Sequence, residues 1–368
     1  MNRVLLGSLC AATLVSLVAC GKKDEAPPAP STTPAPAASA APAAAVTGPV
    51  TIDPAALNAF GVLPAKMESK DNPLTPDKIE LGKRLYFDAR ISANQDVSCN
   101  TCHDLTRYGV DALKVSLGHK KQTGTRNSPT VFNAAIQIAQ FWDGRAKTIE
   151  EQAEKPITNP VEMAMTDDKA VVAVVSSIPE YVAAFKKAFA DDKEPVSIKN
   201  VGRAIGAFER TLVTPSKWDK FLGGDASALN DAEKAGLKKF MDVGCTACHS
   251  GIYLGGQDFK KLGLAKPWPD TKDLGRFAVT KDEVDKQVFK TPILRNVSKT
   301  GPYFHDGSVA TLEEAVKLMA THQLARDLSD AEVKSIVAFL DTLTGDLPGV
   351  NIPKPFPSTA KTPKPNPK

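Results

Sequence analysis

Cys99-Asn100-Thr101-Cys102-His103 and Cys245-Thr246-Ala247-Cys248-His249 are two copies of the pentapeptide Cys-x-x-Cys-His. They use four of the six cysteines in this 368-residue chain. Two thiols at this spacing can add across the two vinyl groups of one porphyrin, and the adjacent His is then placed to bind the iron. We therefore expect two covalently attached c-type haems. The alternatives are a Cys-x-x-Cys redox motif or a structural zinc site, but neither explains why a His follows both times.

The start of the chain has the pattern of an export signal. Residues 1–19 contain Arg3 and a short apolar stretch, and the lipobox Leu17-Val18-Ala19-Cys20 follows. This pattern predicts a lipoprotein signal peptide over 1–19 and lipid attachment at Cys20, with a plain secretory peptide as the alternative. Export agrees with the haem motifs, because c-type haem is attached outside the cytoplasm. We expect a periplasmic protein anchored to a membrane, and Gly21 favours the outer membrane.

The segment after the lipobox is a tether. Residues 20–50 are rich in Ala and Pro, which predicts a disordered, lipid-anchored linker. The remaining residues suffice for two small domains. The formal net charge of +4 would be roughly cancelled by the four propionates of two haems. Net charge therefore indicates no partner, and we expect no nucleic-acid binding.

An internal repeat indicates that the two domains share one plan. Residues 205–212 and 336–343 agree at five of eight positions, and each stretch follows one haem motif. A Ser-x-x-Glu capping box at Ser329 and Glu332 begins an amphipathic helix in the second copy. Another helix is expected before each haem motif: Thr75-Pro76 begins one that runs toward Tyr86, and Asn230 with Glu233 caps one that runs toward Met241.

Two glycines support the same plan. Gly82 and Gly236 occupy equivalent places in the two helices that precede the haem motifs, where each would let a second helix cross closely. A first helix, a haem motif and a crossing last helix make up the cytochrome c plan. We predict a mainly α protein with two cytochrome c-like domains, at 51–214 and 215–346, and a Pro/Lys-rich tail at 347–368.

Each haem iron needs a further axial ligand besides the His of its motif. For the second haem the candidates are Met319, on a helix expected over Thr311 to Ala320, and the histidines His305 and His322. A Met on a helix more often fills a core. For the first haem the candidate is His119, although a His in a loop rich in Gly and Lys is ordinarily just solvated. The residues alone leave these choices open.

The chain resembles the bacterial dihaem cytochrome c peroxidases over roughly residues 71–348. The stretches that carry the resemblance are Cys99-Asn100-Thr101-Cys102-His103, Gly118-His119, Arg126-Asn127-Ser128-Pro129-Thr130-Val131, Phe141-Trp142-Asp143-Gly144-Arg145, Pro160-Val161-Glu162-Met163, Gly275-Arg276-Phe277-Ala278-Val279 and Pro302-Tyr303-Phe304-His305. The resemblance implies a peroxidatic haem in the N-terminal domain and a high-potential electron-relay haem in the C-terminal domain, both facing a common domain interface.

Individual roles follow from the same resemblance. His119 matches a distal iron ligand that leaves when the relay haem is reduced, and Met319 matches the sixth ligand of the relay haem. Trp142 matches a tryptophan between the haems, Glu162 the catalytic acid/base and Gln152 its neighbour. A set of three residues matches the protein ligands of one Ca²⁺ between the domains: Asn127, Thr300 and Pro302. His305 is implied to have a structural or propionate-binding role, whereas His322 has no counterpart.

The expected function is the reduction of hydrogen peroxide to water, with electrons from a small periplasmic cytochrome c or a cupredoxin. Two alternatives remain. A related dihaem enzyme class matures a tryptophan-derived quinone in a partner protein, but places Tyr where Met319 stands. An electron-transfer dihaem cytochrome would have no need of Glu162, Gln152 or a ligand on a mobile loop. Homodimers occur among the relatives, although no patch in this sequence indicates one.

Overall fold

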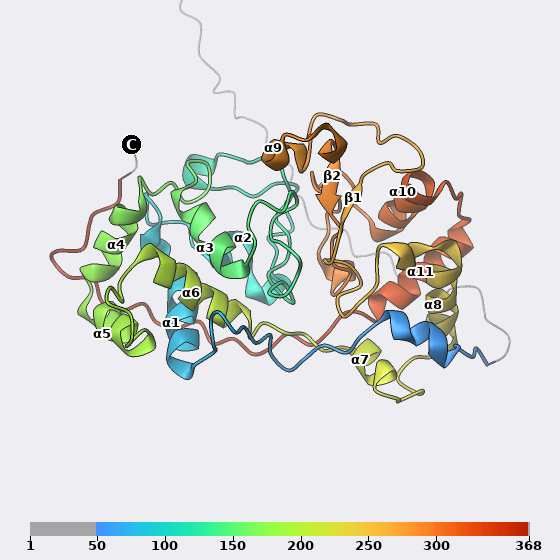
Figure 1. Ribbon diagram of the computed structural model, residues 1–368, viewed down its shortest axis with the longest axis horizontal. Helices are drawn as coiled ribbons and strands as arrows, with labels where there is room; N and C mark the ends of the chain where they lie inside the picture. The colour runs from blue at the N-terminus through green and yellow to red at the C-terminus, as the bar shows by residue number, and fades with distance from the viewer. Residues whose placement is uncertain (1–48, 367–368) are drawn as a thin grey trace, which may run out of the picture. The chain divides into compact units, whose positions relative to one another are not determined.

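The computed structural model describes residues 49–366, which belong to one compact unit. Helices dominate it (Figure 1), and the predicted mainly α fold is confirmed. The predicted signal peptide, Cys20 and the linker up to residue 48 lie outside the described residues. Within the described range, no helix combines the length and the apolar character needed to cross a bilayer.

The secondary structure is as follows. The α-helices are α1 (Pro76–Phe87), α2 (Cys99–Cys102), α3 (Ile149–Thr158), α4 (Asp168–Ser176), α5 (Pro179–Ala188), α6 (Ile198–Glu209), α7 (Lys217–Leu222), α8 (Asp231–Val243), α9 (Phe277–Thr280), α10 (Leu312–Leu324) and α11 (Asp330–Asp341). Short 3-10 turns are η1 (Pro54–Ala59), η2 (Ala89–Ile91), η3 (Leu105–Arg107), η4 (His119–Lys121), η5 (Cys245–Ala247), η6 (Glu283–Asp285) and η7 (Val297–Lys299). Strands β1 (Phe259–Lys261) and β2 (Val288–Lys290) pair antiparallel, with Phe259 opposite Lys290.

The predicted helix starts are confirmed by their caps. The Thr75 hydroxyl accepts a hydrogen bond from the backbone N–H of Lys78 at the start of α1. Capping boxes begin α8, at Asn230 and Glu233, and α11, at Ser329 and Glu332. Each cap satisfies backbone N–H groups that the first helical turn leaves without a partner.

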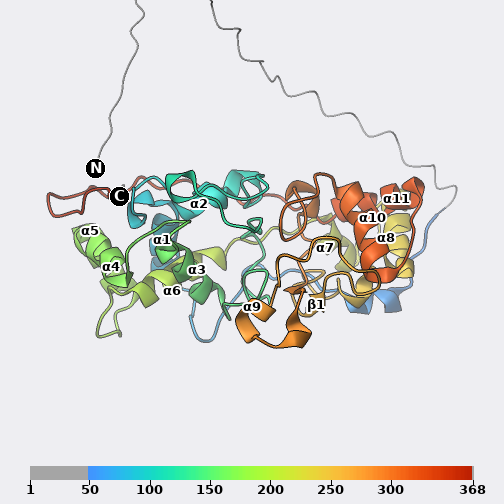
Figure 2. The ribbon, with the colours of Figure 1, turned by 90° about the horizontal axis from the view of Figure 1, so that it is seen from above.

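Two close helix crossings show the predicted repeat. In the first half α1 crosses α6, and a Cβ added at Gly82 would lie 1.8 Å from the carbonyl oxygen of Ala204. In the second half α8 crosses α11, and a Cβ added at Gly236 would lie 2.0 Å from the carbonyl oxygen of Ser335. Any side chain would separate these helices, so both glycines are required by the close approach. α8, α10 and α11 lie side by side in both views (Figures 1 and 2).

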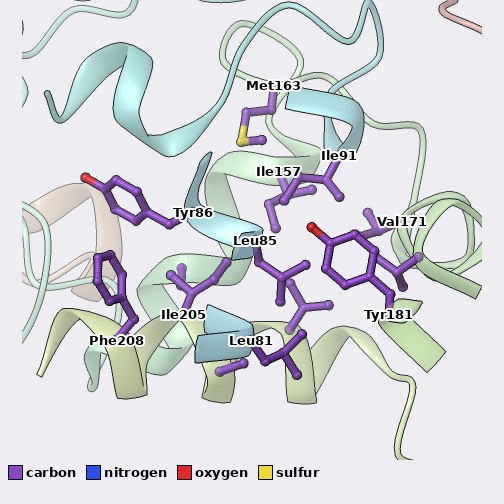
Figure 3. Packing of buried hydrophobic residues seen from close by; sticks show 14 of the residues in the cluster. Leu81, Leu85, Tyr86, Ile91, Ile157, Met163, Val171, Tyr181, Ile205 and Phe208 are labelled. Atoms are coloured by element: carbon purple, nitrogen blue, oxygen red, sulfur yellow. The ribbon is translucent and has the colours of Figure 1, made fainter. Parts of the chain in front are cut away.

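Each crossing is the centre of a hydrophobic cluster. In the first cluster Leu81 and Leu85 of α1 pack with Ile205 and Phe208 of α6 (Figure 3). The second cluster surrounds the fully buried Trp218 and includes side chains from α8 and α11. A third, smaller cluster includes Met67 and Tyr253, whose hydroxyl donates to the Met67 sulfur at 3.0 Å.

The N-terminal end of the described chain packs in the second cluster, and the C-terminal end packs in the first. Ile52 is buried in the second cluster, and Phe60 packs its ring against Trp218 with the centroids 5.2 Å apart. The tail, residues 347–366, instead returns to the first cluster, where it runs beside α4 and α5 (Figure 1). There the ring of Phe356 lies edge-on against Tyr181 of α5. The Arg90 guanidinium donates to the carbonyl oxygen of Phe356 at 2.7 Å. Each cluster is thus completed by chain from the far end of the sequence.

Candidate functional site

Three neighbouring cavities lie along the haem motifs. The first cavity, of about 1230 Å³, is lined by Cys99, Cys102 and His103. The second cavity, of about 1240 Å³, is lined by the corresponding residues Cys245, Cys248 and His249. The middle cavity, of about 700 Å³, shares wall residues with both. Trp142 lines all three cavities.

The first motif is presented by a single turn of helix. Cys99 to Cys102 form α2, which a capping box at Ser98 and Thr101 begins. Burial raises the pKa of the Cys102 thiol to about 11. Burial also lowers the pKa of His103, whose Nδ1 lies 3.2 Å from the Ser128 hydroxyl. A neutral imidazole is the form that binds iron.

The second motif follows α8 directly. Gly244, at φ 103°, ends the helix and turns the chain into η5, which contains Cys245. Nδ1 of His249 lies 2.9 Å from the carbonyl oxygen of Leu254. Because a carbonyl only accepts, this contact places the ring proton on Nδ1 and leaves the lone pair on Nε2 for a metal. Met319 of α10 lines the same cavity.

The residues present fit two c-type haems. Each of the outer cavities contains one complete Cys, Cys and His set. The walls of the second cavity are mostly apolar, including Phe240, Leu312 and Leu340. Cys99, Cys102 and His103 would hold one haem, and Cys245, Cys248 and His249 the other, with Met319 available as a further ligand in the second cavity.

A carboxyl group lies in the wall of the first cavity. Glu162 lines it together with Gln152 and Arg145. Burial raises the pKa of Glu162, and the charge of Arg145 and a hydrogen bond from Asn159 oppose that shift. The Asn159 amide donates to Oε1 of Glu162 at 2.8 Å. A carboxyl group in the wall of such a cavity can take up and return a proton.

His119 contacts the backbone of Glu162 but is not part of the cavity wall. Its side chain is buried, and its Nδ1 has no hydrogen-bond partner within the described residues. Its backbone N–H donates to the carbonyl oxygen of Glu162 at 2.7 Å. Gly118 does line the cavity, and a Cβ added there would lie 2.1 Å from the carbonyl oxygen of Val161. The backbones of the His119 loop and the Glu162 loop are thus in direct contact, with no room for a side chain at Gly118.

The backbone after His119 is strained. Lys120 and Lys121 have φ values of 54° and 59°, in the left-handed region that residues other than Gly rarely adopt. Such strain persists only where the surroundings impose it, and it clusters in switch regions and active sites.

The middle cavity brings together the three residues expected to bind calcium. Asn127, Thr300 and Pro302 all line it. The described residues contain no group of three or more His, Cys, Asp or Glu side chains suited to a metal ion. A hard cation here would therefore depend on amide and carbonyl oxygens. The Trp142 indole N–H donates to the Asn127 carbonyl oxygen at 2.9 Å, which ties this residue to the tryptophan.

The two remaining histidines have structural contacts. His305 is buried, and its ring stacks on Phe289 with the centroids 4.3 Å apart. Nδ1 of His322 lies 3.1 Å from the Lys266 carbonyl oxygen, and its ring packs edge-on against Trp268. His322 therefore holds the loop at 262–268 against α10, which carries Met319.

Sequence reasoning missed Asn159, Arg145 as a charge near Glu162, and Lys290. Asn159 had a local signal, because Asn-Pro marks a turn and a turn places the Asn side chain close to the residues that follow. Lys290 had none: its ammonium donates to the Gln137 side chain, a residue far away in the sequence.

Comparisons with known proteins agree with this geometry. The profile of the family described as "Di-haem cytochrome c peroxidase" matches residues 76–227. Cytochrome c551 peroxidase of Pseudomonas aeruginosa is 50% identical over 304 residues, covering 81% of this chain and 87% of that protein. Cytochrome c551 peroxidase of Nitrosomonas europaea is 49% identical over 298 residues, covering 80% of this chain and 88% of that protein.

A solved structure shows the same fold. The crystal structure of a MauG-like protein associated with microbial copper homeostasis superposes with a TM-score of 0.68 at 30% identity, covering 77% of this chain and 94% of that one. Because 50% of the aligned residues are identical to those of a cytochrome c551 peroxidase, over most of both chains, this chain belongs to the di-haem cytochrome c peroxidase family and is an oxidoreductase of that family.

Proposed function

We propose that this protein reduces hydrogen peroxide to water in the periplasm with electrons from a small redox protein, a monohaem cytochrome c or a cupredoxin. Electrons enter at the C-terminal, high-potential haem and pass to the N-terminal, peroxidatic haem. The bound haem irons supply the one-electron redox chemistry and the site where peroxide binds. The observation that carries the proposal is the half-buried Glu162 in the wall of the cavity that contains His103.

Glu162 moves the proton. Breaking the O–O bond so that water leaves requires a proton to move from one peroxide oxygen to the other. The complete reaction takes two electrons and two protons per H₂O₂ and yields two waters. The raised pKa of Glu162 suits a group that first accepts a proton and then returns it. Gln152, in the same wall, is positioned to orient peroxide through its amide.

Trp142 is the proposed bridge for electrons. It lines the first, middle and second cavities, so its indole lies in the shared wall between the two haem sites. Two backbone contacts hold it there. The indole N–H of Trp142 donates to the Asn127 carbonyl oxygen. The backbone carbonyl of Trp142 accepts from the backbone N–H of Lys290 at 2.8 Å.

His119 is the proposed gate of the peroxidatic iron. The ring of His119 is not part of the cavity wall. Its backbone N–H donates a hydrogen bond to the carbonyl oxygen of Glu162, and the next two residues have positive φ angles. We propose that this loop has a second arrangement in which the imidazole reaches the iron. The described arrangement is then the one that leaves peroxide access to Glu162.

The remaining assignments rest on the sequence and on the cavity walls. We propose one Ca²⁺ in the middle cavity, with oxygen donors from Asn127, Thr300 and Pro302. We also propose domains at 51–214 and 215–346, although Ile52 and Phe60 pack in the second cluster and Phe356 of the tail packs against the first. We further propose a lipid anchor at Cys20 that holds the protein to a membrane, with the outer membrane favoured.

Two other functions are less well supported. An electron-transfer cytochrome does not account for Glu162 and Gln152 in the wall of one haem cavity and not the other. A quinone-forming enzyme related to this family carries Tyr in place of the Met319 that lines the second cavity.

The test is peroxide-dependent oxidation of a reduced monohaem cytochrome c by the calcium-loaded protein. It is run on the fully oxidised and on the half-reduced protein, because the gate predicts turnover only after half-reduction. Replacing Glu162→Gln should lower turnover by about 10²-fold to 10⁴-fold while both haems are retained. Full turnover in that variant would refute the role of Glu162, and no turnover by the wild type in either state would refute the peroxidase.

A further inference from the structure

Lys290, the last residue of β2, is a buried cation without a carboxylate partner. Its side chain is 8% exposed, and within residues 49–366 its ammonium forms no ion pair with Asp or Glu. Its ammonium donates to the side-chain oxygen of Gln137. Burial alone lowers the pKa of Lys290 to about 8. A buried ammonium with only a neutral partner is costly unless an anion is supplied from elsewhere.

The position of Lys290 indicates where that anion comes from. It lines both the second cavity and the middle cavity, and it is the only charged side chain in the described wall of the middle cavity. The described wall of the second cavity contains two lysines, Lys260 and Lys290, and no Asp or Glu. Lys260 pairs with Asp258, so Lys290 is the lysine in this wall that has no carboxylate partner among the described residues.

The next residue adds a second donor. Thr291 is buried and lines the second cavity, and its hydroxyl has no hydrogen-bond partner within the described residues. A buried hydroxyl without a partner is uncommon in folded proteins and points to a group that completes the site. Lys290 provides an ammonium at the border of the second and middle cavities, and Thr291 provides a hydroxyl in the wall of the second cavity. An ammonium and a hydroxyl are both suited to a carboxylate.

We propose that Lys290 pairs with a propionate of the C-terminal haem at the border of the middle cavity and raises the reduction potential of that haem. A fixed positive charge beside the porphyrin favours the reduced iron, which carries one positive charge less than the oxidised iron. The backbone N–H of Lys290 also donates to Trp142, so the same strand end holds the proposed counter-ion and the proposed electron bridge. The inference rests on the proposed two-haem assignment.

Lys260 provides a matched control. It lies on β1 opposite Phe289, next to Lys290 in the ladder, and it lines the same cavity. Its ammonium, however, pairs with Asp258 at 3.0 Å, and its side chain is 40% exposed. Solvent and Asp258 therefore screen its charge, and its removal should change the haem potential little.

The experiment is a spectroelectrochemical titration of the calcium-loaded, two-haem protein. Lys290→Met should lower the equilibrium constant for one-electron reduction of the C-terminal haem at least tenfold, a fall of about 59 mV. Lys290→Arg should keep it within twofold, and so should Lys260→Met. Should Lys290→Met fail to retain both haems, Lys290→Gln takes its place with the same expectation.

The outcomes separate this inference from the proposed function. A wild-type protein without two distinct haem waves would refute the two-haem assignment itself. Two waves in the wild type with no change in Lys290→Met would refute only the role of Lys290. An equal fall in Lys290→Met and Lys290→Arg, or in Lys290→Met and Lys260→Met, would likewise overturn it, because the effect would not follow the buried charge.

Discussion

Replacing Gly118 by Ala tests the backbone fit between the loop of His119 and the loop of Glu162. The added Cβ would lie 2.1 Å from the carbonyl oxygen of Val161, and 2.7 and 2.8 Å from the Cα and the carbonyl oxygen of Glu162. These are backbone atoms, so no side chain can rotate away to make room. One of the two loops must move by about an ångström to restore ordinary contact distances.

The magnitude of the effect follows from that displacement. Overpacking of this kind costs about 1–3 kcal/mol, which corresponds to a fall in Tm of roughly 2–12 °C at about 2–4 °C per kcal/mol. The rate of catalysis should fall as well, because the displaced residue is Glu162. A misplacement of about 1 Å can cost about 10²-fold in rate. We therefore expect Gly118→Ala to lower kcat/KM for peroxide about a hundredfold in a protein that stays folded.

Gly124→Ala is the matched control. Gly124 lines the same cavity, and a Cβ added there would meet nothing within 4 Å. The assay compares the peroxidase rates, haem contents and Tm values of both variants with those of the wild type. Gly118→Ala at wild-type kcat/KM, like Gly124→Ala, would refute the reasoning. A loss of activity accompanied by loss of haem would refute it as well, because the effect would then not pass through Glu162.

Two further predictions concern pH dependence and stability. The Asn159 amide stabilises the ionised Glu162, so Asn159→Leu should raise the pKa of that carboxyl and move the acid limb of the kcat/KM profile to higher pH; a shift to lower pH would contradict this. Arg295, fully buried, donates to Asp219 at 2.6 and 3.0 Å. Arg295→Met should lower the free energy of unfolding by about 3–5 kcal/mol, against less than about 1 kcal/mol for Lys238→Met at the exposed pair with Asp242, as measured by denaturant unfolding; equal losses would contradict it.

The features that the sequence predicted correctly are local. The caps of α1, α8 and α11 are each formed by two residues three apart, so their signal is contained in one short stretch. The end of α10 shows the limit of such signals. The helix was predicted to end at Ala320 but continues to Leu324, where Ala325 adopts a left-handed conformation. Gln323 is held there by the backbone of the loop at 261–264, which no local pattern reveals.

The site shows the same division. The haem motifs are contiguous, so the sequence alone indicates their chemistry, and the family resemblance supplied Glu162, His119, Trp142 and the calcium residues. The shared position of Trp142 between three cavities depends on long-range packing. So does the partnership of Lys290 with Gln137, two residues that occur in no common motif.

Each of the two hydrophobic clusters includes residues from the opposite end of the described chain, and this packing affects how the two halves of the protein unfold. The first cluster is incomplete without Phe356 and the rest of the tail, which the chain reaches only after it has passed through the second cluster. The second cluster likewise requires Ile52 and Phe60, which precede the first. The core of each half therefore includes apolar side chains from the far end of the chain. Unfolding of either half would remove an apolar segment from the core of the other, so we expect the stabilities of the two haem sites to be coupled.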